Sequence, residues 1–114
     1  MLQNLSQPVW LADAETEQYV DVSNAALEMF GYTREEFLAL RGVDILDKSE
    51  HGRVDAAREN AKKKWGLGQW WHFLRKDGTT FHAQVRFHFQ QFEGRRCLVV
   101  MIVNTESAAA ASAR

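Results

Sequence analysis

The sequence of 114 residues has little of several features that mark whole classes of protein. Its single cysteine, Cys97, excludes an internal disulfide and a Cys-x-x-Cys site, and it fits a reducing cytoplasm. No apolar run approaches the roughly 18 residues of a membrane span. The N-terminus, MLQNLSQPVW, lacks the charged start and long apolar stretch of a signal peptide. We therefore expect a cytoplasmic domain with no membrane span in this chain.

An excess of charge of one sign is also missing. The formal net charge is -1 and no basic stripe is present, so nucleic acid is not expected as a partner. Hydrophobic residues make up 46% and charged residues 25%, an ordinary globular composition that argues against disorder. At this length the chain is expected to bury one core.

Catalytic and metal-binding motifs are absent as well. The sequence has no nucleophile elbow, phosphate-binding glycine loop or His-Glu-x-x-His helix, so we expect no enzyme. His82 and His88 share one face of a predicted strand, but roughly 20 Å of strand separates them. His72 on a neighbouring strand brings the ligands to two at best, whereas a closed zinc site takes four. We therefore expect no metal.

Five segments are predicted to be strands: 8–14, 17–22, 69–75, 80–92 and 97–103. An Asp-Gly pair between the third and fourth is a strong hairpin signal. The fourth segment alternates between apolar and polar residues, which predicts one buried and one wet face. The fifth is apolar on both faces and is therefore predicted to be a central strand.

Two short helices are predicted between the second and third strands. Ser23 and Asn24 are both N-cap residue types for the first helix, which Gly31 ends because glycine readily adopts the left-handed conformation. Thr33 caps the second helix, with Glu36 in the capping-box position.

A longer helix is predicted over 50–64, after a connection at 41–48. Four apolar residues at spacings of three and four form one stripe on it: Val54, Ala57, Ala61 and Trp65. The Gly-Leu-Gly at 66–68 is predicted to end it. Two strands, helices and three strands together predict an α+β fold, with a five-stranded antiparallel sheet and helices packed over one face.

Several motifs then carry a resemblance. The segments PVWLAD, SNAALEMFGYTREEFL, RKDGTTFHAQV and the closing NTE resemble, in this order and spacing, those of PAS domains. The resemblance implies a PAS domain over 8–106, a lead-in segment at 1–7 and a tail or linker stump at 107–114. Two departures are Ser23, where the family usually has Asn, and Val103, where the closing motif usually has an Asp that couples the sheet to the next domain.

PAS folds form a cup between the helices and the inner face of the sheet, and the resemblance implies the same cup here. Together with the alternating strand, it predicts the side chains that line a ligand pocket: Trp10, Ala12, Val54, Ala57, Trp71, Phe73, Ala83, Val85, Phe87, Val99 and Met101. The alternative is that these side chains simply fill the core, since close packing is the default for interiors. Few polar anchors are visible, so a ligand is expected to be apolar or aromatic.

The other face of the sheet is predicted to carry a partner surface. Five apolar residues on the first and last strands are expected to point outward there: Val9, Leu11, Leu98, Val100 and Ile102. A continuous apolar patch on a wet sheet usually marks an interaction site. The resemblance implies that the partner is a second copy, which makes a homodimer.

The resemblance raises two cofactors, flavin and haem. Flavin-binding LOV members need a reactive cysteine shortly after the second short helix; here Gly42 lies near that place, and Cys97 is expected to be a core residue. Haem-binding members offer a histidine from the long helix, and His51 lies near its predicted start. We favour an exposed or capping histidine, with haem as the alternative.

The expected function is that of a sensory or regulatory module of a bacterial signalling protein. It binds a small molecule in its cup, mediates dimerisation, or both, and so controls an output domain not present in these residues. The alternatives are a purely structural dimerisation module with a filled core, and a haem-binding gas or redox sensor.

Overall fold

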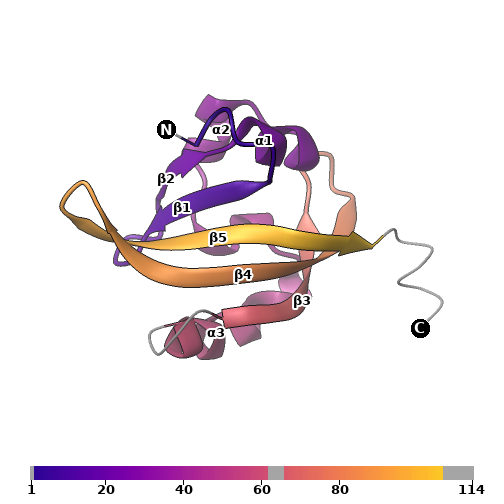
Figure 1. Cartoon of the computed structure of the whole chain (residues 1–114). Coiled ribbons are helices and arrows are strands. Elements are labelled where there is room, and N and C mark those ends of the chain that lie inside the picture. The colour runs from indigo at the N-terminus through magenta and orange to yellow at the C-terminus, as the bar shows by residue number, and fades with distance from the viewer. Residues whose placement is uncertain (1, 62–65, 107–114) are drawn as a thin grey trace.

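The computed structural model describes residues 2–61 and 66–106 of the chain. Its elements in chain order are β1 (Val9–Asp13), β2 (Tyr19–Val22), α1 (Asn24–Phe30), α2 (Arg34–Leu38), η1 (Gly42–Ile45), η2 (Lys48–Arg53), α3 (Val54–Ala61), β3 (Gly66–Leu74), β4 (Thr80–Phe92) and β5 (Arg95–Glu106). The strands form one antiparallel sheet in the order β2-β1-β5-β4-β3 (Figure 1). The predicted α+β fold is confirmed.

The core lies between the inner face of this sheet and the helices. α1 and α2 lie beside β1 and β2, and α3 lies beside β3 (Figure 1). Phe30 of α1 and Phe37 of α2 are fully buried against Trp10 of β1. Phe73 of β3 joins them, with its ring centroid 5.6 Å from that of Phe30. Strands β1 and β3, which are separated by two other strands in the sheet, are therefore linked by aromatic contacts.

The short helices begin and end where the capping residues predict. Ser23 Oγ accepts a hydrogen bond from the N–H of Ala26, and Gly31 ends α1 with φ at 83°. Thr33 and Glu36 form a complete capping box at the start of α2. Each cap satisfies backbone N–H groups that the first helical turn leaves unpaired.

The predicted helix over 50–64 is wrong at its start, because η2 precedes α3 as a 3₁₀ segment. Asp47 caps η2 by accepting from the N–H of Ser49. The Glu50 carboxylate turns inward to accept a hydrogen bond from the β3 N–H of His72. The tighter 3₁₀ turn thus holds Glu50 against the sheet. Residues 62–65, including the predicted end of the helix, lie outside the described residues.

The Gly-Leu-Gly segment at 66–68 is the beginning of β3. Gly66 pairs with Phe87 and Leu67 with Arg86, and the register then shifts before Trp70. Glycines within a strand commonly accompany such irregularities. β5 is also longer than its predicted segment 97–103, because its pairing with β4 continues from Phe92 through His82.

Candidate ligand pocket

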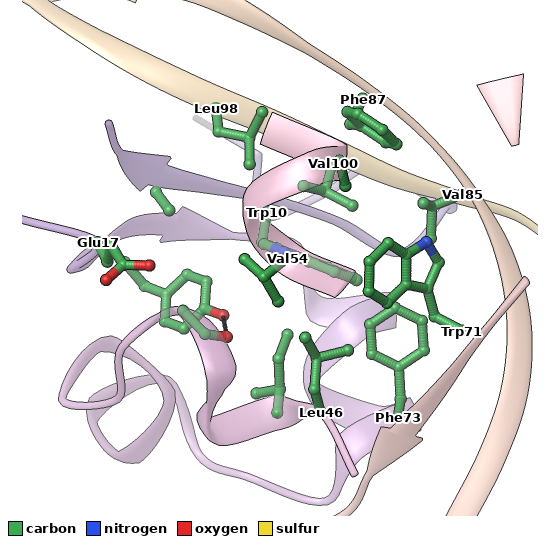
Figure 2. Close-up of a pocket in the computed structure, with 15 residues that line it drawn as sticks. Trp10, Glu17, Leu46, Val54, Trp71, Phe73, Val85, Phe87, Leu98 and Val100 are labelled. Carbon is green, nitrogen blue, oxygen red and sulfur yellow. Dashed lines mark hydrogen bonds between the residues drawn. The ribbon is translucent and has the colours of Figure 1, made fainter. Parts of the chain in front are cut away.

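A cavity of about 100 Å³ lies between the sheet and the helices (Figure 2). Its lining residues are Trp10, Ala12, Glu17, Tyr19, Gly42, Ile45, Leu46, Val54, Ala57, Trp71, Phe73, Val85, Phe87, Leu98 and Val100. Most of them are apolar, and the lining residues that the structure describes include no lysine, arginine or histidine. The pocket thus offers a hydrophobic space with few groups for orienting a ligand.

Eight of the eleven predicted pocket residues line this cavity: Trp10, Ala12, Val54, Ala57, Trp71, Phe73, Val85 and Phe87. Their inward placement follows from strand pairing, because residues directly opposite on antiparallel strands share a face. Trp71 pairs with Ala83, which is fully buried in the core without lining the cavity. Trp70, one residue earlier, instead has its ring centroid 5.2 Å from that of His82. The role of the eight lining residues in ligand binding stays a prediction.

Val99 and Met101 do not line the cavity, and the predicted parity of β5 is wrong. Trp10 of β1 pairs with Val100, and Ala12 pairs with Leu98, so Leu98 and Val100 face the pocket. Val99 and Met101 therefore lie on the outer face. The physical reason is that β5 is apolar on both faces, so its sequence carries no alternation that fixes which face is buried.

The same correction divides the predicted dimer surface. Leu98 and Val100 line the pocket, and Ile102 belongs to the core. Val9 and Leu11 do face outward, paired with Met101 and Val99, but they are only 2% and 5% exposed. The outer apolar strip of β1 and β5 therefore consists of Val9, Leu11, Val99 and Met101.

Polar residues that the sequence reasoning missed close one side of the pocket. The Tyr19 hydroxyl donates a hydrogen bond of 2.7 Å to the carbonyl of Gly42. Burial raises the pKa of the Tyr19 phenol above its ordinary value, and the carboxylates of Asp44 and Glu17 raise it further. A Cβ at Gly42 would lie 2.8 Å from Glu17 Oε1, so glycine there makes room for this carboxylate. In the sequence, Gly42 was the only residue of this group that pointed to an unusual local structure.

Trp71 supplies an unusual polar group at the opposite side of the pocket. Its indole Nε1 is buried and has no hydrogen-bond partner among the residues that the structure describes. In Figure 2 this nitrogen lies on the ring edge near Val85. The guanidinium of Arg53 lies 4.3 Å from the ring centroid, where it covers one face of the indole.

Glu50 and Arg53 hold this wall in place. Arg53 Nη1 donates to both carboxylate oxygens of Glu50, at 2.8 and 3.0 Å. The Glu50 Oε2 also accepts from the backbone N–H of His72 at 2.7 Å. Since Glu50 is only 5% exposed, these partners compensate for the burial of its charge. The pair thereby ties η2 to β3 beside the pocket.

Comparison with known proteins now gives the family. The family model described as "PAS domain" matches residues 6–105, which is most of the chain. This chain belongs to the PAS domain family. PAS domains are sensory modules of signalling proteins and are generally not enzymes. No curated protein sequence matches the chain significantly.

Solved structures share the PAS fold with this chain. A PAS domain of a two-component sensor histidine kinase is 16% identical with a TM-score of 0.73, over 91% of this chain and 88% of that one. A PAS domain from Desulfitobacterium hafniense is 22% identical with a TM-score of 0.73, over 91% and 97%. One from Colwellia psychrerythraea is 12% identical with a TM-score of 0.77, over 93% and 92%. At these identities the likeness concerns the fold alone.

His51 and Cys97, the two side chains considered for cofactor binding, are not among the residues that line the cavity. His51 Nε2 lies 3.1 Å from the carbonyl oxygen of Val43 and 3.2 Å from that of Leu46, and the side chain is exposed. Cys97 is fully buried, which raises the pKa of its thiol, and it does not line the cavity. Within residues 2–61 and 66–106, no three His, Cys, Asp or Glu side chains gather as a metal site. No helix in this described part has the length and apolar character to span a membrane.

Proposed function

We propose that this PAS domain is a sensory module that binds a small, mainly apolar molecule in its cavity and controls an output domain elsewhere in its parent protein. The observation that carries the proposal is the cavity of about 100 Å³ with its apolar walls. An engineered apolar cavity of about 150 Å³ in another protein stays dry and takes up benzene. The space here therefore suits a compact ligand. Placement in the cytoplasm of a bacterium stays a prediction from the sequence.

The test uses benzene as a probe and two alanines that are adjacent on α3. Ala57 lines the cavity, whereas Ala56 is exposed. Benzene should raise the melting temperature of the wild type, because a ligand of the folded state stabilises it by mass action. Ala57→Leu should fill the cavity and abolish this shift, while the matched control Ala56→Leu should retain it. An absent benzene shift in the wild type would contradict the proposal.

We also propose self-association through the outer strip of Val9, Leu11, Val99 and Met101. The supporting observation is that β1 and β5 pair these four apolar side chains on one face, with Val99 and Met101 only half-buried. Water contact with apolar surface is unfavourable by about 25 cal/mol per Å². Sedimentation velocity of the wild type tests this, and a monomer at high micromolar concentration would contradict it.

A further inference from the structure

The indole N–H of Trp71 is a hydrogen-bond donor without an acceptor. Burial removes it from water, and within the described part of the chain no acceptor replaces the water. Buried tryptophans usually find a partner for this group, because an unpaired buried donor keeps the full cost of its desolvation. Trp71 is only 5% exposed and also lines the cavity. In Figure 2 the nitrogen lies on the ring edge near Val85, which also lines the cavity, so a molecule that reaches this edge would supply the missing acceptor.

The rest of the lining limits the charge of such a molecule. Glu17 contributes a carboxylate on the side of the pocket opposite Trp71 (Figure 2). Among the lining residues in the described ranges 2–61 and 66–106, no cationic side chain compensates an anion. Burying an unpaired charge in apolar surroundings is far more costly than burying a neutral polar group. Anions are therefore disfavoured.

We propose that the pocket selects compact molecules that have no negative charge and carry a hydrogen-bond acceptor, such as a ring nitrogen or a carbonyl or ether oxygen, and that this acceptor takes the indole N–H of Trp71. The inference rests on the proposed function, since it requires that the cavity admits a ligand. Tyr19 is not a second donor for the ligand, because its hydroxyl already donates to the Gly42 carbonyl. Selectivity for an acceptor therefore depends on the Trp71 side of the pocket.

Benzene and pyridine form a matched pair of probes for this donor. The two rings have nearly the same size and shape, but pyridine carries one acceptor nitrogen and is uncharged at mildly alkaline pH. Water solvates pyridine better than benzene, so their absolute affinities are not the test. The informative quantity is the change in each dissociation constant on mutation, measured by NMR titration of the whole 114-residue chain.

Trp71→Phe keeps an aromatic wall and removes the donor. It should weaken pyridine binding about 3- to 10-fold more than benzene binding, the effect of one hydrogen bond. Trp70→Phe is the control on the same strand, because Trp70 lies near His82 and does not line the cavity. This control should leave the ratio of the two dissociation constants unchanged.

The outcomes separate the inference from the proposed function. If Trp71→Phe weakens both probes by the same factor, the donor role is overturned while the ligand pocket stands. If neither probe binds the wild type, the pocket proposal fails and the inference with it. A measurement on the unmutated domain covers the case in which Trp71→Phe does not fold. Saturating pyridine should slow solvent exchange of the Trp71 indole N–H more than saturating benzene does, and equal slowing would overturn the donor role.

Discussion

The interior of this PAS domain is filled on one side and hollow on the other. On the filled side, Phe30 has its ring centroid between 5.2 and 5.8 Å from those of four aromatic rings: Trp10, Phe37, Phe73 and Phe81. On the hollow side, the side chains that α3 presents to the cavity, among those the structure describes, are the small Val54 and Ala57. The two sides share one sheet and differ in the size of the side chains that the helices bring to it.

The difference indicates how a small domain combines a stable core with space for a ligand. The filled side lies under α1 and α2, whose ends are fixed by Ser23, Gly31 and Thr33. The hollow side lies under η1, η2 and α3, where the Glu50–Arg53 pair supplies a polar link to β3. Ligand sites are commonly drawn from the less stable parts of a fold. We expect the filled side to carry most of the stability.

The largest effect on stability is expected for Phe30→Ala, and Trp71→Ala is its counterpart on the hollow side. Phe30→Ala should lower the free energy of unfolding by about 3–5 kcal/mol, because it opens a cavity among four rings. Trp71→Ala should lower the free energy of unfolding by less, since this side chain already borders the cavity and its truncation breaks fewer contacts. Chemical denaturation of both variants measures the difference. A cost for Trp71→Ala equal to that for Phe30→Ala would mean that the two sides are equally packed.

Sequence reasoning placed the filled side well, because its signals are local. The cap residues Ser23 and Thr33 predict the helix starts through their own hydrogen bonds with the backbone. β4 predicts its own buried face, since apolar and polar residues alternate along it. Each of these features depends on residues close together in the chain.

The errors fall on the hollow side, where long-range contacts decide the structure. Glu50 looked like an ordinary residue of a helix, but its acceptor role toward His72 is set across 22 positions of sequence. The faces of β5 are fixed by its neighbours β1 and β4, and no pattern within β5 reveals them. Glu17 and Tyr19 gave no signal because their hydrogen bonds with the backbone of Gly42 join residues that are far apart in the sequence.

The next largest effect uses two adjacent residues of β5 that face opposite sides of the sheet. Val100→Glu should lower the free energy of unfolding by about 2 kcal/mol or more, because its carboxylate would enter a pocket whose described lining residues are mainly apolar and include no cation. Val99→Glu should cost less than about 1 kcal/mol, since it faces outward, where substitutions are usually mild. Denaturation curves of the two variants check the assignment of faces.

The variants Val99→Glu and Val100→Glu also test self-association. Val99→Glu should shift a dimer of the wild type toward the monomer, as measured by sedimentation velocity, while the domain stays folded. The reverse pattern, with Val99→Glu unfolded and Val100→Glu folded, would contradict the parity of β5 in this structure.

The smallest effect concerns Asp21, which holds the lead-in segment beside β2. Partial burial by itself raises the pKa of this carboxyl, but hydrogen bonds from the N–H groups of Leu2 and Val22 and the charge of Arg34 outweigh it and hold the pKa below its ordinary value. A pKa that is lower in the folded state contributes stability above the unfolded pKa, and this contribution is lost as the pH falls through the folded value. Asp21→Asn should therefore cost less than about 1 kcal/mol at neutral pH, because the pair with Arg34 is partly exposed to solvent. The difference from the wild type should vanish in acid below the folded pKa, as measured by denaturation across pH. A difference that stays constant over the whole range would show that the Asp21 charge does not stabilise this part of the sheet.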